Sequence, residues 1–368
     1  SRRRHTRLLT VTGVQTCALP ICILIGNPRR IASWKYAALR SKGNQSLGCK
    51  LHGYLEIVMG KCLILGGAGF LGSNLAQKLV AEGETVRIFT RPGSSTSNIQ
   101  HILDRVELIY RDFMDDVALR NATQNIDTVY HLISTTFPSM TMESSVYDLM
   151  SNLLPTIRLV EACLANGVRK IIYASSGGTV YGKPALLPIP QEHPLVPTSA
   201  YGQSKLTIEN YLNFYARSTS LDISVLRIAN PFGPSQKMLG VQGIVAVAMG
   251  CAYYGRPLNV YGEGKAVRDY IYVDDVIDAV FLAAAHSGSS VVNISSAVGS
   301  SVMDIVRAVE EISGRTIVKR FIPDRPGDVE VNVLDNCKAK QLYGWSPKTT
   351  LREGLRKTWE HISQGPPA

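Results

Sequence analysis

Short apolar runs alternate with longer amphipathic segments along most of this chain, from Met59 to the C-terminus. The short runs are rich in β-branched and other apolar residues and cover 62–65, 86–89, 106–109, 128–132, 170–174 and 223–227. Between them, apolar residues recur at helical spacing, for example over 74–82, 146–166 and 201–217. Strands that alternate with helices predict parallel βαβ units. The predicted fold class is therefore α/β, with a doubly wound parallel sheet of the Rossmann type.

The alternation becomes looser after Pro231, where Gly and Pro recur through 230–240 and 255–264. We therefore expect a second, smaller C-terminal lobe. The segment 274–294 again has the pattern of one helix and one strand, so this lobe is interleaved with the sheet. The larger domain is predicted to span 59–230 plus 274–294, and the smaller lobe 231–273 plus 295–363.

The formal net charge of +10 is concentrated at the start of the chain. Residues 1–58 contain ten Lys and Arg residues and one acidic residue, Glu56, which leaves 29 basic and 28 acidic residues, or +1, for the rest. A nearly neutral body without a basic run among aromatic residues argues against nucleic-acid binding. The content of 45% hydrophobic and 18% charged residues is typical of a globular protein.

The basic start of the chain is unusual in a second way. Residues 11–21 resemble a translated DNA-sequencing adapter, so we interpret 1–58 as an artefactual leader and Met59 as the natural start. The rival interpretation is a secretory signal, because Arg2 to Arg4 precede an apolar stretch around 17–26. That stretch is interrupted by Pro20 and has no clean small-residue cleavage site. We expect no membrane association.

Four cysteines lie in the body of the chain: Cys62, Cys163, Cys251 and Cys337. No pair of them has the spacing of a metal site or a redox motif, so we predict no metal ion. Isolated thiols of this kind are usually small buried apolar residues. They are typical of a reducing compartment, and the expected location is the cytoplasm.

A glycine-rich turn follows the first predicted strand. Residues 66–72 have the sequence Gly-Gly-Ala-Gly-Phe-Leu-Gly and run directly into a helix. Glycine is needed where the chain turns sharply, where the backbone approaches a pyrophosphate and where the helix packs on the strand. The positive end of the helix dipole then faces the phosphates. A strand, a glycine turn and a helix in this order predict a dinucleotide-binding site.

The end of the second strand departs from the usual dinucleotide pattern. An acidic residue about twenty positions after the glycine turn ordinarily binds the adenosine ribose, whereas this chain has Thr90 and Arg91. Two interpretations of Arg91 stay open: it pairs with the additional phosphate of NADP, or it is a solvated residue that stacks on adenine. The expected cofactor is NAD, with NADP as the variant that Arg91 would permit.

Tyr201 and Lys205 lie at the start of another predicted helix. A spacing of four residues places the phenol and the ammonium on one helix face. A phenol with a pKa of about 10 is a poor base at neutral pH, but a neighbouring cation favours the phenolate. The pair follows the hydroxyl-rich strand end 175–179. We predict that Tyr201 transfers protons and that Lys205 activates it.

Five motifs, taken in order, resemble one family. They are the glycine turn, Tyr201-Gly-Gln-Ser-Lys205, the segment 227–234 (Arg-Ile-Ala-Asn-Pro-Phe-Gly-Pro), the segment 268–275 (Arg-Asp-Tyr-Ile-Tyr-Val-Asp-Asp) and the segment 325–328 (Arg-Pro-Gly-Asp). Together they resemble the NAD-dependent epimerase/dehydratase family of extended short-chain dehydrogenases, and within it the UDP-glucose 4-epimerases. The resemblance covers about 59–363. It implies that the larger domain binds the dinucleotide and that the smaller lobe binds the substrate.

The resemblance also implies roles for individual residues. The implied catalytic residues are Tyr201, Lys205 and Ser176. The implied cofactor-binding residues are Gly66, Gly69, Phe70, Leu71, Gly72, Arg91, Asp112, Phe113, Leu132, Tyr201, Lys205 and Pro231. The implied substrate-binding residues are Asn230, Asn259, Tyr261, Arg268, Arg325 and Asn332. Arginine suits a diphosphate because its planar fork matches the phosphate oxygens.

One position departs from the family pattern. The catalytic Ser or Thr of the family lies four residues before the Tyr of a Tyr-Gly pair, and this chain has Gly177 there. The neighbouring hydroxyls are Ser176 and Thr179. We predict that Ser176 is the catalytic one, because a small shift of a glycine-containing loop aims it at the sugar. The alternative is that Ser176 only bonds the backbone.

The implied activity is 4-epimerisation of a nucleotide sugar through a 4-keto intermediate. The expected substrates are UDP-glucose and UDP-galactose, or N-acetylated counterparts, because Asn332 is small where restricted epimerases carry a bulky Tyr. Dehydratases and decarboxylases of the family carry Glu at the position of Thr179, and dehydratases also carry Asp at the position of Gly178. This chain lacks both carboxylates, so neither elimination nor decarboxylation is the expected activity.

Two alternatives remain. An NADPH-dependent 4-keto-sugar reductase is favoured by Arg91, and a non-catalytic dinucleotide sensor by Gly177. The resemblance further implies a homodimer formed through a helical bundle.

Overall fold

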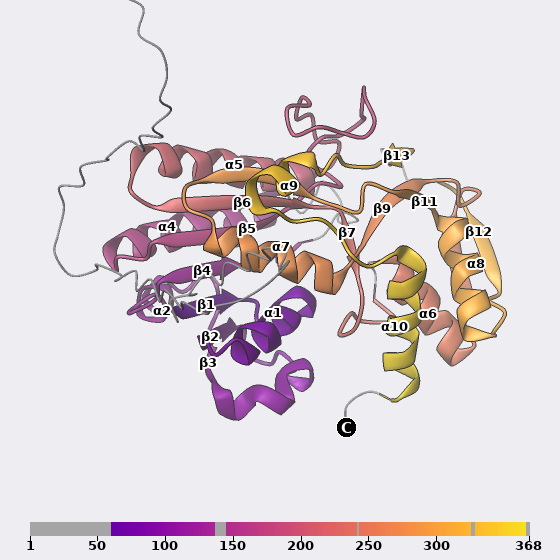
Figure 1. Ribbon diagram of the computed structural model, residues 1–368, viewed down its shortest axis with the longest axis horizontal. Helices are drawn as coiled ribbons and strands as arrows, with labels where there is room; N and C mark the ends of the chain where they lie inside the picture. Colours follow the sequence, from indigo (N-terminus) through magenta and orange to yellow (C-terminus); the bar gives the residue numbers. More distant parts are fainter. Residues whose placement is uncertain (1–59, 137–144, 241–242, 325–327, 366–368) are drawn as a thin grey trace, which may run out of the picture. The chain divides into compact units, whose positions relative to one another are not determined.

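A seven-stranded parallel sheet dominates the computed structural model, which describes residues 60–136, 145–240, 243–324 and 328–365 (Figure 1). Its strands are β1 (Lys61–Leu65), β2 (Thr85–Thr90), β3 (Val106–Tyr110), β4 (Thr128–His131), β5 (Lys170–Ser176), β6 (Asp222–Ile228) and β10 (Ser290–Ile294). The order across the sheet is β10-β6-β5-β4-β1-β2-β3. Because this order reverses between β1 and β4, the sheet is doubly wound, and the predicted fold class is confirmed.

Helices cover both faces of this sheet. Successive side chains of a strand point to opposite faces, so Ile64 packs with α1 (Phe70–Ala81) and α7 (Val273–Ala285). Leu65 points the other way and packs with α2 (Asp116–Ala122), α4 (Leu154–Ala165) and α5 (Ala200–Ser218). Burial on both faces explains why the central strands are continuous apolar runs instead of alternating ones.

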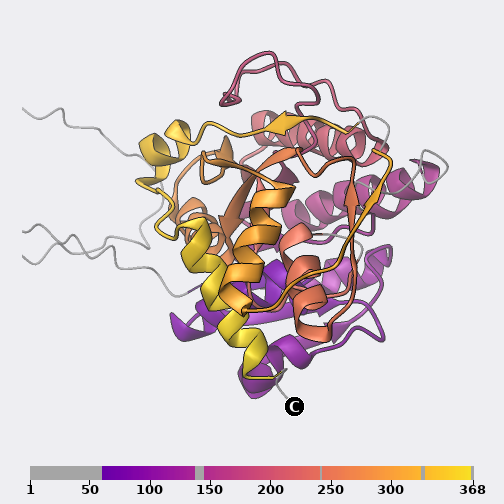
Figure 2. The same cartoon turned by 90° about the vertical axis from the view of Figure 1, so that its right-hand side faces the viewer.

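Among the described residues after β6, two small sheets form separately from the large one, and we call them, with the helices beside them, the smaller lobe. One sheet contains β7 (Asn230–Phe232), β9 (Val267–Tyr272), β11 (Gly299–Ser301) and β13 (Val331–Asn332), and the other pairs β8 (Leu258–Tyr261) with β12 (Lys319–Ile322). The helices are α6 (Ile244–Tyr254), α8 (Val302–Ser313) and α10 (Leu351–Ser363), which face the viewer in Figure 2.

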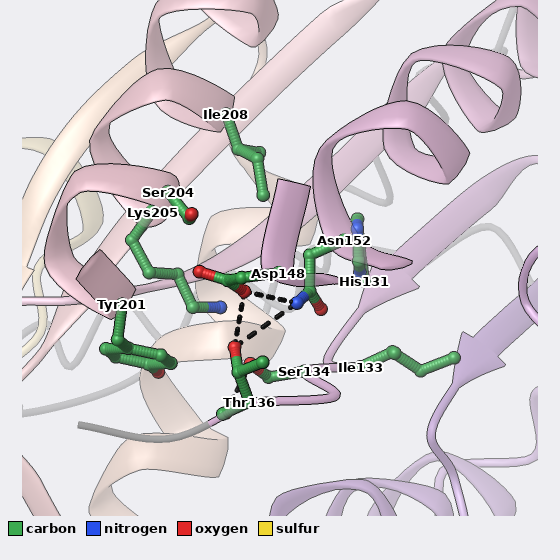
Figure 3. Close-up of a pocket in the computed structure, with 10 residues that line it drawn as sticks. All are labelled: His131, Ile133, Ser134, Thr136, Asp148, Asn152, Tyr201, Ser204, Lys205 and Ile208. Atoms are coloured by element: carbon green, nitrogen blue, oxygen red, sulfur yellow. Dashed lines mark hydrogen bonds between the residues drawn. The ribbon is translucent and has the colours of Figure 1, made fainter. Parts of the chain in front are cut away.

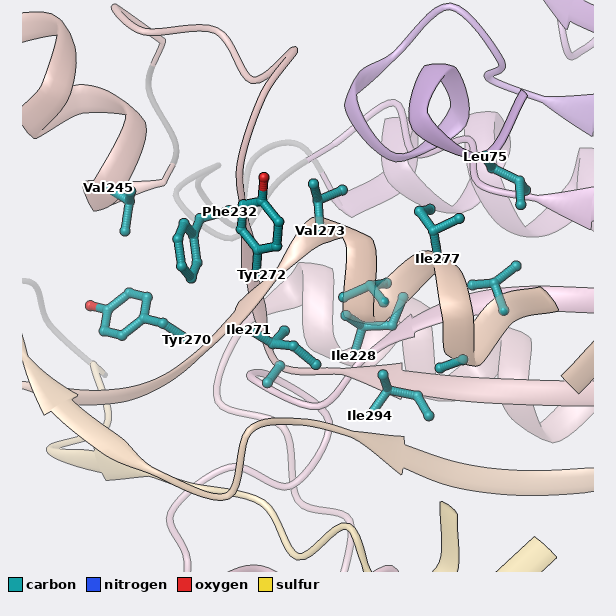
Figure 4. Packing of buried hydrophobic residues seen from close by; sticks show 14 of the residues in the cluster. Leu75, Ile228, Phe232, Val245, Tyr270, Ile271, Tyr272, Val273, Ile277 and Ile294 are labelled. Atoms are coloured by element: carbon teal, nitrogen blue, oxygen red, sulfur yellow. The ribbon is translucent and has the colours of Figure 1, made fainter. Parts of the chain in front are cut away.

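An apolar cluster joins the smaller lobe to the sheet (Figure 4). Phe232 of β7 and Tyr272 of β9 pack edge to face, with ring centroids 5.7 Å apart. Gly354 of α10 packs directly on them, since a Cβ at Gly354 would lie 2.8 Å from either ring. This packing fixes β7 beside the large sheet. By contrast α9 (Cys337–Tyr343), from the segment assigned to the smaller lobe, packs on β10, where the Tyr343 hydroxyl bonds Ser290 at 2.7 Å.

The segment 146–166, expected to be one continuous helix, contains a π turn. Helix α3 (Ser145–Asp148) leads into the π turn η3 (Leu149–Leu153), and α4 follows. Pro155 lies at the start of α4 and lacks the N–H that an unbroken α-helix would need there. The wider π turn accommodates this break. It also turns Ser151 and Asn152 into the interior, where both are buried.

Candidate active site

The glycine turn forms a close approach of backbone to backbone. Gly66 has a φ of +83°, and the Gly69 N–H donates to the Gly66 carbonyl at 3.0 Å. A Cβ at Gly72 would lie 2.2 Å from the Gly66 oxygen, so only glycine allows α1 to start here. The first turn of α1, with Phe70 and Leu71, has no side-chain cap and no acidic residue. Its open N–H groups therefore fit a pyrophosphate.

Other predicted cofactor residues lie at the carboxyl ends of neighbouring strands. Arg91 follows β2 and is exposed, and Asp112 follows β3, with its Oδ1 accepting from the Met114 N–H at 2.8 Å. Phe113 is buried and packs edge to face on His131, the last residue of β4. Leu132 follows directly and is half-buried. In doubly wound sheets this edge binds dinucleotides.

Helix α5 presents the Tyr201 and Lys205 side chains on one face, as predicted (Figure 3). The helix is capped by Ser199, whose Oγ accepts from the Gly202 N–H at 3.1 Å. A Cβ at Gly202 would lie 2.7 Å from the Thr179 carbonyl, so glycine lets α5 approach the segment that follows β5. Lys205 is buried, and its Nζ donates to the Ala174 carbonyl at 3.0 Å. That Nζ is 5.7 Å from the centroid of the Tyr201 ring.

Ser176 is the last residue of β5, and its hydroxyl lies near the Tyr201 phenol and acts to lower the pKa of Tyr201. Gly177 has no room for a side chain: a Cβ there would lie 2.3 Å from Leu334 Cδ1 and 3.0 Å from the Arg227 carbonyl. Thr179 Oγ1 is buried without a hydrogen-bond partner among the described residues.

The protonation of Tyr201 and Lys205 is set mainly by burial. Burial raises the pKa of Tyr201 to about 12, although the nearby Ser134 and Ser176 hydroxyls act to lower it. Burial lowers the pKa of Lys205 to about 8, while the charges of Asp148 and Glu209 act to raise it. At neutral pH the phenol is therefore protonated and Lys205 is mostly an ammonium.

A polar group that the sequence analysis missed lines the same cavity (Figure 3). Asp148 Oδ1 accepts from Asn152 Nδ2 at 2.6 Å, and Thr136 Oγ1 also donates to it. Asp148, Asn152 and Thr156 recur every four residues and are all buried. A polar stripe at helical spacing in an apolar segment was the signal that would have revealed them. Ser134, in the loop after β4, had no such signal.

Two of the predicted substrate residues meet near Ser176. Asn332 is 1% exposed, and its Nδ2 donates to the Gly177 carbonyl at 3.3 Å, while its Oδ1 has no partner among described residues. Asn230 Nδ2 donates to the Asp269 carbonyl at 3.0 Å, and Pro231 follows it in β7. These side chains come from β13 and β7, strands that both pair with β9.

The other predicted substrate residues are more dispersed. Arg268 is opposite Asn332 in the pairing of β9 with β13, and its Nη2 forms an ion pair with Asp328 Oδ1 at 2.6 Å. Asn259 and Tyr261 lie on the outer face of β8, in the separate two-stranded sheet. Arg325 lies outside the described residues.

No group of three or more His, Cys, Asp or Glu side chains suited to a metal ion occurs in the described part of the chain. Cys62, Cys163 and Cys251 are buried free thiols, and burial raises the pKa of Cys62 to about 12. Across residues 60–365, apart from the three undescribed gaps, no helix has the length and apolar character needed to cross a membrane.

A doubly wound sheet with a glycine turn at β1 and a Tyr–Lys pair on α5 defines a dinucleotide-dependent enzyme of the short-chain dehydrogenase type. Residues 62–295 match the NAD-dependent epimerase/dehydratase family, and the chain belongs to that family. The predicted family, the NAD cofactor and the assignment as an enzyme are thereby confirmed.

Several known proteins are similar over nearly their whole length. The chain is 33% identical over 305 residues to UDP-glucose 4-epimerase of Mycolicibacterium smegmatis, covering 82% of this chain and 97% of that protein. Two solved structures are UDP-glucose 4-epimerases at 32% identity, each covering 83% of this chain and 99% of the other. One is from Thermotoga maritima, with UDP-glucose and a TM-score of 0.79. The other is from Thermus thermophilus, with NAD and a TM-score of 0.78.

Proposed function

We propose that this protein is a nucleotide-sugar 4-epimerase that interconverts UDP-glucose and UDP-galactose, or N-acetylated counterparts, through a 4-keto intermediate. The observation that carries the proposal is the Tyr201 phenol, close to the Ser176 hydroxyl and one helical turn from the buried Lys205. The similarity to UDP-glucose 4-epimerases supports the same activity.

Tyr201 is the group that moves the proton of the sugar C4 hydroxyl. Ser176, close to the phenol, orients the sugar hydroxyl toward it. The ammonium of Lys205 favours the phenolate electrostatically, and a positioned acid/base of this kind contributes roughly 10²–10⁴-fold to a rate. After C4 is oxidised, the 4-keto sugar rotates so that the opposite face of C4 is reduced, and Tyr201 returns the proton to the C4 oxygen.

NAD fits the carboxyl edge of the sheet. Gly66, Gly69 and Gly72 leave the open start of α1 for its pyrophosphate, since a Cβ at Gly72 has no room. Asp112 and Phe113 at the end of β3, Leu132 after β4 and Pro231 in β7 complete the proposed set, with Arg91 beside the adenosine ribose. NAD, when bound, supplies the hydride acceptor and donor.

The sugar site lies between the segment after β5 and the strands of the smaller lobe. Asn332 is buried there and bonds Gly177, next to Ser176. An amide at this position is smaller than the bulky Tyr of restricted epimerases, and its Oδ1, which has no partner among the described residues, is an acceptor for an N–H donor. This supports acceptance of N-acetylated sugars. Asn230 and Arg268 are proposed to bind the diphosphate, and Asn259 and Tyr261 the base.

The reductase alternative is favoured by one observation, the basic Arg91 in place of an acid after β2. Purified protein should be incubated with UDP-galactose and no added cofactor, and UDP-glucose measured. Turnover supports an epimerase, whereas a requirement for stoichiometric NADPH on a 4-keto sugar indicates a reductase, and no turnover in either assay a sensor. Tyr201→Phe should abolish turnover and retain NAD binding, because only the transferable proton is lost. Full activity in this variant would refute the role of Tyr201.

A homodimer and a cytoplasmic location complete the proposal. Large apolar side chains are exposed on the adjacent α3, η3, α4 and α5, namely Val146, Met150, Leu154, Tyr211 and Phe214. An exposed apolar patch over paired helices fits a four-helix interface with a second copy. Light scattering of the purified protein measures the molar mass. The buried free thiols support a reducing compartment.

A further inference from the structure

Asp148 is a buried carboxylate with one oxygen held and one oxygen free. It is 3% exposed and lies at the end of α3, where the chain enters the π turn. Asn152 and Thr136 both donate to its Oδ1, which fixes the orientation of the carboxylate. Its Oδ2 is buried and has no hydrogen-bond partner among the described residues. The same cavity is lined by Tyr201 and Lys205 (Figure 3).

The titratable groups around Asp148 come from three further elements. Lys205, Tyr201 and Glu209 belong to α5, Tyr173 to β5 and His131 to β4. Glu209 is already paired with Arg227 at 2.7 Å, and burial lowers the pKa of His131 to about 3, so that ring is neutral.

Lys205 is therefore the cation on this cavity that lacks a direct anionic partner among the described residues. Its Nζ donates to a neutral carbonyl, that of Ala174. A buried ammonium without a counter-charge loses its proton readily, and buried lysines with a pKa of about 5–6 are documented.

We propose that Asp148 is a positioning residue: a fixed, non-contacting counter-ion that keeps Lys205 charged. The inference rests on the proposed function, in which the Lys205 ammonium activates Tyr201. Because Asp148 Oδ2 does not bond Lys205, the ammonium stays beside Tyr201 and Tyr173, at 5.7 and 4.8 Å from the two ring centroids. A direct ion pair would instead draw the ammonium away from the phenol.

The direct test is the titration of Lys205 in Asp148→Asn. The protein is labelled with ¹³Cε-lysine, and the Lys205 resonance is identified by its absence in Lys205→Met. In wild type the midpoint is expected near pH 8. Asp148→Asn should lower it by about one pH unit or more, the usual effect of losing a nearby opposite charge. Asp116→Asn makes the same change in the exposed ion pair between Asp116 on α2 and Arg158 on α4, and it should leave the midpoint unchanged.

A second measurement separates a charge role from a structural one. In Asp148→Asn, kcat at pH 8 should fall about fivefold or more and partly recover toward pH 6, where Lys205 regains its proton, with KM for UDP-galactose unchanged. A loss that is equal at all pH values marks Asp148 as merely structural.

An unchanged Lys205 midpoint in Asp148→Asn overturns the proposal. Asp148→Ser, which removes the charge from a smaller side chain, serves if Asp148→Asn does not fold. If neither variant folds, a wild-type midpoint near pH 6 would show that Lys205 has no effective counter-ion and also overturns it. The titration needs no turnover, so failure of the epimerase assay leaves this test intact.

Discussion

Replacement of Glu209 by glutamine should destabilise the protein strongly, because it breaks a buried ion pair. Glu209 on α5 is 1% exposed and Arg227 on β6 is 4% exposed. Arg227 Nη2 donates to Glu209 Oε2 at 2.7 Å, and Nε lies 3.1 and 3.2 Å from the two carboxylate oxygens. Ser175 also donates to Glu209. Burial acts to lower the pKa of Arg227, but hydrogen bonds and charge from Glu209 more than offset it, so the pKa is raised.

The magnitude follows from leaving a charge without its partner. Removing one member of a buried ion pair typically costs about 3–5 kcal/mol, since the remaining charge stays desolvated. For a domain of this size each kcal/mol lowers the melting temperature by roughly 2–4 °C. A fall of roughly 6–20 °C is therefore expected for Glu209→Gln. Arg227 keeps hydrogen bonds to the Tyr181 hydroxyl and the Gln191 carbonyl, which favours the lower half of that range.

Calorimetry on wild type, Glu209→Gln, Glu209→Leu, Arg227→Met and the double variant Glu209→Leu/Arg227→Met measures this effect. The double variant should be more stable than the sum of the single losses, because apolar groups replace both charges. The exposed pair of Arg158 and Asp116 is the control, and Asp116→Asn should cost less than about 1 kcal/mol. A cost for Glu209→Gln that matches this control, or strict additivity, would refute the reasoning.

Three further predictions concern the cofactor, the substrate and pH. Arg91→Ala should weaken NADP more than NAD by about 1–3 kcal/mol in a binding titration. Arg111→Ala, just after β3, is its control, and equal weakening of NADP and NAD would reduce Arg91 to a residue that stacks on adenine. Asn332→Tyr should lose UDP-N-acetylglucosamine turnover and keep UDP-glucose turnover, since overpacking penalises the larger ligand. Equal losses of turnover on both substrates would contradict the idea that residue 332 limits the size of the sugar. Burial lowers the pKa of His131 to about 3. Stability present above pH 6.5 is therefore lost below it, by about 1.4 kcal/mol per pH unit. Melting temperatures at pH 7 and 5 should diverge less in His131→Gln, and an equal divergence would count against a neutral His131.

The sheet was predictable because each of its signals is local. The run 62–65 is apolar on both faces, as a strand buried in a parallel sheet must be. The glycines after it indicate a sharp turn with close backbone contacts. The position of Tyr201 and Lys205 on one face of a helix also follows from helical periodicity. The observed strand ends differ from the predicted ones by one or two residues, as for β5, which extends to Ser176 instead of residue 174. That extension matters because it carries the hydroxyl toward Tyr201.

The rest of the site depends on long-range contacts that periodicity does not encode. Asp148 is near Lys205 only because the π turn rotates the chain before Pro155. Arg268 faces Asp328 through a strand pairing across the smaller lobe, and its sequence motif alone suggested a free phosphate ligand. Ser134 meets Tyr201 because β4 and β5 are neighbours in the sheet. Each of these contacts joins segments that are distant in sequence.

Gly177 shows how one such contact explains an apparent defect in the family pattern. Read as sequence, the missing hydroxyl suggested a protein that had lost turnover. In the structure Leu334, two residues beyond β13, fills the space where a side chain at 177 would lie, at 2.3 Å from the ideal Cβ. Leu334 is fully buried, so moving it to make space would disrupt the close packing of the core. Position 177 therefore has no room for a hydroxyl, and Gly177 is the consequence of packing Leu334 against the segment after β5, while Ser134 and Ser176 are the hydroxyls near Tyr201.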